Sequence, residues 1–234
     1  YQGAHTPEEY AKIYHEYYTF LKKEDPTAQV AIGGIVQPTP LRLEWLDRVM
    51  DSYQQTYNEP MNVDVWNIHN QVLQEKSNDY GAGIPVGIDA TEGALYPWWQ
   101  NDDFEVFKQH VIAFRQWMAD NGQRDKPLII SEFGVLYPSS WFDKLGGPKG
   151  DERVKTYMTQ TFQWLADATD PELGFPADGN RLVQRWAWYG LNNLSWDQNK
   201  ASGFNGNLTN ARTRKLTVFG EHYEMLVNDL AQSH

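Results

Sequence analysis

The segment from Lys126 to Gly134 (KPLIISEFG) constrains the fold more than any other stretch of this chain. Leu128 to Ile130 is continuously apolar rather than alternating, which is typical of a buried strand in a parallel sheet. Glu132 follows where the apolar run ends. Because side chains alternate along a strand, we predict that Leu128, Ile130 and Glu132 share one face, with Glu132 at the strand's C-terminal tip.

A carboxylate at this position has two interpretations. Ligands of α/β folds bind at the C-terminal ends of the parallel strands, and a charge buried there is costly unless it is paired or used. Alternatively, Glu132 caps the following loop or pairs with an arginine. Position alone leaves both interpretations open.

Strand patterns alternate with helix patterns along the whole chain. Apolar runs predict strands at residues 29–36, 63–69, 128–132 and 182–191. Amphipathic stretches with capping signals predict helices at residues 7–23, 40–53, 103–120, 154–165 and 219–230. Because no linker or composition shift divides the chain, we expect a single α/β domain over residues 1–234, with helices covering a parallel sheet.

The composition excludes several classes of partner. The net charge of -11 argues against nucleic acid or an anionic membrane surface, and no apolar run reaches the roughly 18 residues of a membrane span. There is no cysteine, so disulfides and thiolate chemistry are excluded and the compartment is left open. The six histidines are scattered without metal-ligand spacing, so we expect no metal and no cofactor.

Two strand ends carry a family resemblance. The sequence Ser131-Glu132-Phe133-Gly134, followed one unit later by Arg185-Trp186-Ala187-Trp188-Tyr189, resembles the C-terminal half of clan A glycoside hydrolases. The resemblance implies a TIM (β/α)8 barrel, of which this chain supplies about four βα units equivalent to strands five to eight. The single domain then lacks the N-terminal half of its barrel.

The resemblance also implies roles for particular residues. Glu132 matches the catalytic nucleophile of these retaining enzymes. Trp186 or Trp188 matches the strand-eight aromatic residue that lines the sugar subsite. Asn67 and His69 fall at the strand-six position near the nucleophile, although an inward-facing histidine is as often a satisfied core residue.

Retaining hydrolysis needs a second carboxyl group about 5–5.5 Å from the first. In the family this acid/base ends strand four, usually within an Asn-Glu-Pro motif. Asn58-Glu59-Pro60 has these letters, but an amphipathic helix precedes it and it lies before the strand at residues 63–69, so we interpret it as a helix-to-strand turn. Asp197 and Glu92 are weak substitutes, and we expect the acid/base upstream of Tyr1.

Further aromatic residues lie in loops on the predicted active side. Trp98, Trp99, Tyr137 and Trp141 are candidates for binding a sugar, because exposed tryptophans need a ligand or partner to cover them. Packing within the loops is the alternative. Tyr137 is also a candidate hydrogen-bond donor to Glu132, together with Asn67 and His69.

The sequence therefore favours a retaining β-glycoside hydrolase that acts on a poly- or oligosaccharide outside the cell. One alternative is a non-catalytic carbohydrate-binding or scaffold half-barrel, and another is a different α/β enzyme with Glu132 as general base. Four parallel strands with open edges expose hydrogen-bonding groups. We therefore expect a missing barrel half, or a second copy of the chain, as partner.

Overall fold

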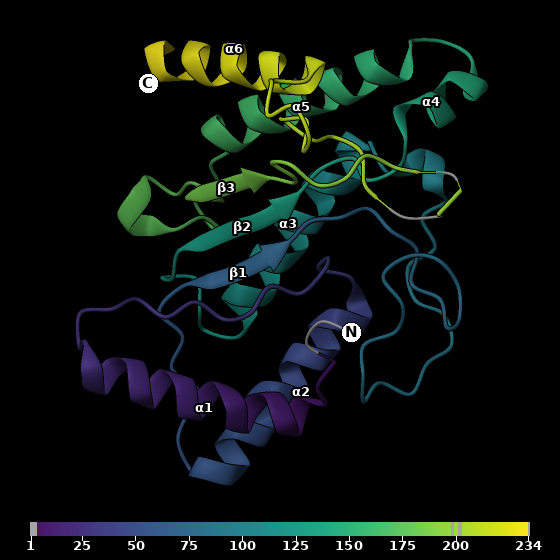
Figure 1. Cartoon of the computed structure of the whole chain (residues 1–234). Coiled ribbons are helices and arrows are strands. Elements are labelled where there is room, and N and C mark those ends of the chain that lie inside the picture. The colour runs from purple at the N-terminus through teal and green to yellow at the C-terminus, as the bar shows by residue number, and fades with distance from the viewer. Residues whose placement is uncertain (1–3, 198, 201–202, 234) are drawn as a thin grey trace.

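The computed structural model describes residues 4–197, 199–200 and 203–233, so the segment next to Tyr1 lies outside the described residues. Helices and three short strands alternate along the chain (Figure 1). The helices are α1 (Pro7–Glu24), α2 (Pro40–Tyr57), α3 (Phe104–Asp120), α4 (Ser139–Phe142), α5 (Gly150–Asp167) and α6 (Val218–Ser233), with a 3-10 turn at Trp98–Gln100. The strands are β1 (Trp66–His69), β2 (Leu128–Phe133) and β3 (Arg185–Trp188).

The three strands form a parallel sheet in the order β1-β2-β3. A mixed α/β fold with a parallel sheet is therefore confirmed. None of the helices in the described ranges is long and apolar enough to cross a membrane.

The strand predicted at residues 29–36 does not form as a regular strand. This segment runs parallel to β1 but pairs only through the isolated bridges Ala31–Val65 and Ile35–Ile68. Between these bridges lies Gly34, where an added Cβ would sit 2.7 Å from the His69 ring.

The last strand is also shorter than predicted, covering Arg185–Trp188 rather than residues 182–191. A buried arginine on α3 contacts the residues just before this strand. Arg115 donates from Nε to the Leu182 carbonyl (2.6 Å) and from Nη2 to Gln184 Oε1 (2.9 Å). These bonds hold the segment that enters β3, where the backbone N–H of Gln184 donates to the Leu128 carbonyl at 2.9 Å.

Helices cover one face of the sheet and leave the other face open. In Figure 1, α3 lies across the back of the sheet, α1 and α2 lie beyond its β1 edge, and α5 and α6 run along its β3 edge. The core lies on the α3 side, where Trp66 packs against Phe114 and Trp117. The opposite face carries side chains that are exposed or half-buried: Asn67, Ile129, Ser131, Arg185 and Ala187.

Local signals in the sequence explain the helix ends. Thr6 and Glu9 form the predicted capping box at the start of α1. Asn58 ends α2 in the left-handed conformation (φ 56°), so Asn58-Glu59-Pro60 is the helix-to-strand turn that we predicted. The turn leads into β1 from its N-terminal end, and the exposed Glu59 is therefore remote from the strand tips.

Candidate active site

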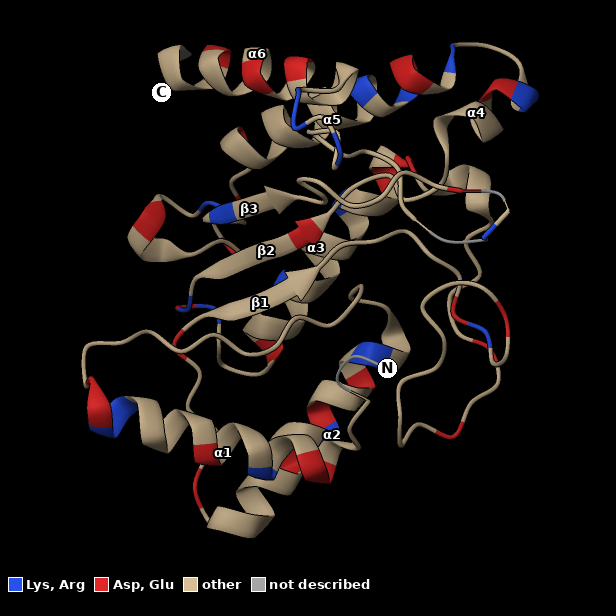
Figure 2. Cartoon of the chain, in the orientation of Figure 1, with Lys and Arg blue, Asp and Glu red and all other residues tan. Residues whose placement is uncertain are grey.

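Glu132 lies near the C-terminal end of β2, the middle strand, and its position departs from simple alternation. Ile68 pairs with Ile130, but the next residue, His69, pairs with Glu132, so Ser131 is an extra residue in a β-bulge. The prediction that Glu132 shares a face with Leu128 and Ile130 was therefore wrong. The bulge turns Glu132 to the open face, where its side chain keeps 31% exposure. In Figure 2 the β2 ribbon carries one red segment, toward its arrowhead.

Two side chains from the end of β1 approach the Glu132 carboxylate. Gln71 donates from Nε2 to Glu132 Oε1 at 3.1 Å, and Gln71 is only 2% exposed. His69 Nδ1 lies 3.8 Å from the same oxygen, which is too long for a hydrogen bond. Burial lowers the pKa of His69, and the Glu132 charge opposes this only in part, so the imidazole is neutral at pH 7.

Asn67 and His69 share one face of β1, as predicted, and that face is the open one. The Asn67 side chain, however, holds the bulge. Its Oδ1 accepts a hydrogen bond from the backbone N–H of Ser131 at 3.3 Å. A bulged residue loses its ladder partner, and this bond replaces it. Asn67 therefore influences the orientation of Glu132 indirectly, by stabilising the bulge in β2.

The two tryptophans of β3 lie on the helix-covered face, not beside Glu132. Trp186 pairs with Ile130 and Trp188 with Phe133, so both face the core. Both rings contact Phe162 of α5, and Trp188 Nε1 donates to the Gly206 carbonyl at 2.8 Å. The structure thus does not bring the strand-eight candidates to Glu132.

Tyr189, the residue after β3, is an aromatic residue whose hydroxyl is affected by the Glu132 charge. Burial raises the pKa of its hydroxyl, and the nearby Glu132 charge raises it further. Asn193 donates from Nδ2 to the Tyr189 hydroxyl oxygen at 2.6 Å. Sequence analysis missed both Tyr189 and Gln71. The signals available were their positions one residue after Trp188 and two residues after His69.

A second feature at this end of the sheet is an aromatic cleft of about 560 Å³. Its walls contain Trp98, Trp99, Tyr137 and Trp141, all four of which we predicted from their loops, and also Tyr80 and Trp196. The rings contact one another edge-on, as Trp98 does with Trp141 at 5.8 Å between centroids. Asp79 is the carboxylate among the residues that line this cleft.

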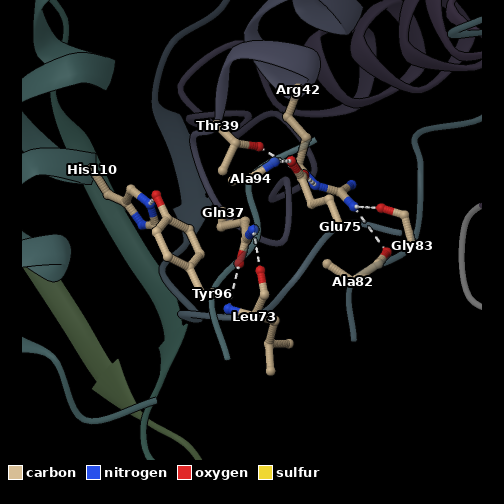
Figure 3. A network of polar contacts seen from close by, with 10 residues as sticks. All are labelled: Gln37, Thr39, Arg42, Leu73, Glu75, Ala82, Gly83, Ala94, Tyr96 and His110. Carbon is tan, nitrogen blue, oxygen red and sulfur yellow. Dashed lines mark hydrogen bonds and ion pairs between the residues drawn. The ribbon is translucent and has the colours of Figure 1, made fainter. Parts of the chain in front are cut away.

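The loop between β1 and α3 carries much of this cleft, and buried polar contacts fix it (Figure 3). Glu75, with no exposed side-chain surface, accepts from Arg42 Nε at 2.8 Å and from the Thr39 hydroxyl at 2.7 Å. Gln37 exchanges two hydrogen bonds with the Leu73 backbone, at 2.8 and 2.9 Å. The loop is therefore tied to α2 and to the segment before it.

Within the described ranges, no group of three or more histidine, aspartate or glutamate side chains is arranged to hold a metal ion. A comparison with protein families gives a match over almost the whole chain. The model of the family described as "Glycosyl hydrolase catalytic core" matches residues 1–223. The chain belongs to this glycosyl hydrolase family.

Three glycosidases are among the solved structures similar to this glycosyl hydrolase. An endo-β-1,3-glucanase from Pseudomonas viridiflava shares 16% identity and a TM-score of 0.47, covering 93% of this chain and 62% of its own. A β-glucosidase from Exiguobacterium marinum shares 11% identity and a TM-score of 0.47, and the match covers 95% of this chain and 56% of the glucosidase. A β-glucuronidase from an uncultured Clostridium sp. shares 13% identity and a TM-score of 0.42, and the match covers 94% of this chain and 35% of the glucuronidase.

The glycosyl hydrolase chain spans about three fifths or less of each of these proteins, and similarities this low do not indicate its substrate. A search of curated proteins found no match.

The two weak substitutes for an acid/base are engaged elsewhere in this glycosyl hydrolase. Glu92 forms an ion pair with Lys76 at 3.0 Å, and Asp197 caps a turn by accepting from the Asn199 backbone N–H at 3.0 Å.

Proposed function

We propose that this chain carries the nucleophile of a retaining β-glycoside hydrolase, and that the nucleophile is Glu132. One observation carries the proposal. The Glu132 carboxylate stands at the C-terminal end of the middle strand, on the open face, where buried Gln71 holds one of its oxygens. The neutral amide of Gln71 orients the carboxylate through one oxygen and leaves the other oxygen accessible for attack.

The chemistry follows from that placement. The Glu132 carboxylate forms a bond to the anomeric carbon while the bond from that carbon to the leaving oxygen breaks. The acid/base protonates the leaving oxygen and later removes a proton from the water that releases the sugar. Neutral His69 beside Glu132 leaves the charge of the nucleophile uncompensated, which favours attack.

We assign the chain to the C-terminal half of a clan A (β/α)8 barrel. Residues 30–36, β1, β2 and β3 correspond to strands five to eight. Their parallel order and the helices on one face support this assignment. A second βα half, from the same polypeptide or from another copy of the chain, then covers the open face. It brings the acid/base to about 5–5.5 Å from Glu132.

The substrate that we propose is a β-linked poly- or oligosaccharide outside the cell. The aromatic cleft supports this choice, because flat aromatic faces stack on sugar rings. Its volume of about 560 Å³ falls within the usual range for ligand sites.

Covalent trapping tests the role of Glu132. Dinitrophenyl 2-deoxy-2-fluoro-β-glycosides need no acid catalyst, since their leaving group departs as a stable phenolate. A panel of gluco, galacto, manno, xylo and glucurono reagents is incubated with the protein, and intact and peptide masses are recorded. We expect one added sugar on the peptide that contains Glu132 and none on the Glu132→Gln variant. A sugar attached to another residue rejects the proposal.

A non-catalytic carbohydrate-binding half-barrel is the second candidate. The observation that favours it is that Glu132 does not line the aromatic cleft. Sugar oligomers that quench tryptophan fluorescence equally in wild type and Glu132→Gln, with no trapping by any reagent, would support this candidate over the first.

A further inference from the structure

We propose that Gln71 is a positioning residue that selects which oxygen of Glu132 attacks the sugar. This inference rests on the proposed function of Glu132 as nucleophile. Gln71 follows β1 by two residues, so it lies beside the C-terminal end of β2 without belonging to the paired strand.

The backbone around Gln71 is held on both sides. Its own N–H donates to the Val36 carbonyl at 3.2 Å, and the N–H of Asn70 donates to the Glu132 carbonyl at 2.9 Å. Asn70 is itself fixed through Nδ2, which donates to the Phe107 carbonyl at 3.0 Å. The Gln71 side chain therefore leaves a rigid backbone, and its 2% exposure leaves it little freedom.

The chemistry of the contact fixes the orientation of the Gln71 amide. An ionised carboxylate only accepts hydrogen bonds, so the amide presents its NH2 group to Glu132. The amide oxygen then points into the protein, where it is buried without a hydrogen-bond partner in the described structure. An unpaired buried acceptor is unfavourable for folding, so this glutamine is better suited to the carboxylate than to the core.

The two oxygens of Glu132 are consequently unequal. Oε1 accepts from Gln71 Nε2 at 3.1 Å and faces His69 Nδ1 at 3.8 Å, whereas Oε2 has no hydrogen-bond partner among the described residues. Oε2 therefore forms the bond to the anomeric carbon while Oε1 stays held. Among the described residues, the titratable groups that interact electrostatically with this carboxylate include His69 and Tyr189.

Gln71→Met is the decisive variant, because methionine has nearly the same shape but no donor and no unpaired oxygen. The inactivation constants of a dinitrophenyl 2-fluoro glycoside are measured with wild type, Gln71→Met and the exposed-site control Gln54→Met. We expect the first-order rate constant of Gln71→Met to fall about 10- to 100-fold, the effect of losing a hydrogen bond to a charged group, with unchanged reagent affinity. Its free energy of unfolding in urea should equal or exceed that of wild type.

Each other outcome decides a different point. Trapping of Glu132 at an unchanged rate in Gln71→Met overturns the positioning role but leaves the proposed function intact. A lower rate together with lower stability assigns Gln71 to structure and also overturns the role. A wild type that is trapped elsewhere, or not at all, while Gln54→Met behaves identically, rejects the proposed function and this inference with it.

Discussion

The buried pair of Arg42 and Glu75 holds the loop that carries the aromatic cleft, and its removal has a calculable cost. Arg42 Nε lies 2.8 Å from Glu75 Oε1, with side-chain exposures of 10% and 0%. The Arg42 Nη2 group also donates to the carbonyls of Ala82 and Gly83, at 2.9 and 3.1 Å (Figure 3). The guanidinium thus joins α2 to two points of the loop.

Glu75→Gln keeps the shape of the side chain but removes the charge. The Arg42 guanidinium then stays buried without a counter-charge, and breaking such a pair from one side costs about 3–5 kcal/mol. Because the amide oxygen still accepts one hydrogen bond, we expect a loss at the lower end, about 3 kcal/mol. That is a large fraction of the roughly 5–15 kcal/mol that stabilises a typical domain.

Equilibrium unfolding in urea, followed by tryptophan fluorescence and far-ultraviolet circular dichroism, measures this loss. The double variant Arg42→Met/Glu75→Gln supplies the control, because it removes both charges. We expect it to be more stable than Glu75→Gln alone. A loss of less than about 1 kcal/mol in Glu75→Gln, with an unchanged urea slope, would refute the argument that Glu75 is the buried counter-charge of Arg42.

Three further perturbations test the core and the cleft. Burial lowers the pKa of His110 to about 4, so its imidazole stays neutral in the folded protein over a pH range in which the same residue of the unfolded chain, with an ordinary pKa of 6.5, takes up a proton. The contribution of His110 to the free energy of unfolding should therefore be fully present above pH 6.5 and fall by up to about 3 kcal/mol as the pH drops to 4. The His110→Gln variant should lose this dependence. Equal urea midpoints at pH 5 and pH 7 in wild type would contradict the argument. Trp188→Ala should cost about 3–5 kcal/mol, because Trp188 is 7% exposed. Trp99→Ala, at a site 48% exposed, should change stability by less than about 0.5 kcal/mol but reduce the fluorescence quenching by sugar oligomers; the reverse pattern would place Trp99 in the core.

The helices and the middle strand could be predicted because their signals are local. A capping box at Thr6 and a continuous apolar run at Leu128 to Ile130 need no knowledge of distant residues. Residues 29–36 pair with the β1 segment only through isolated bridges, and Gly34 among them lies against the His69 ring, which comes from another segment. No local pattern contains that contact.

Part of the site was predictable for a similar reason. The loops that follow parallel strands meet at one end of the sheet, and Trp98, Tyr137 and Trp141 accordingly line one cleft. Gln71 was missed because the apolar pattern of the strand ends at His69, although the alternation continues for one more step. Its contact with Glu132 crosses 61 residues of sequence and depends on how β1 and β2 pair.

The bulge at Ser131 explains both the error about Glu132 and the placement of the β3 aromatics. Leu128 and Ile130 are buried two residues apart, but the next buried side chain, Phe133, comes three residues later. A strand without the bulge would turn Glu132 toward α3 and bury its charge, because a one-residue slip exchanges the two faces. The extra residue sends Glu132 to the open face and returns Phe133 to the core, where it pairs with Trp188.

Because Trp188 pairs with Phe133 on the core face, side-chain alternation directs the next residue, Tyr189, to the opposite face. The spacing of three residues between the apolar positions Ile130 and Phe133 is therefore the sequence signal for the bulge. Read as a bulge, it places Glu132 and Tyr189 together on the open face and the two tryptophans behind them. Asn67, which accepts the N–H of Ser131, stabilises this arrangement from the neighbouring strand. The carboxylate is accessible because the strand that bears it is irregular at that residue.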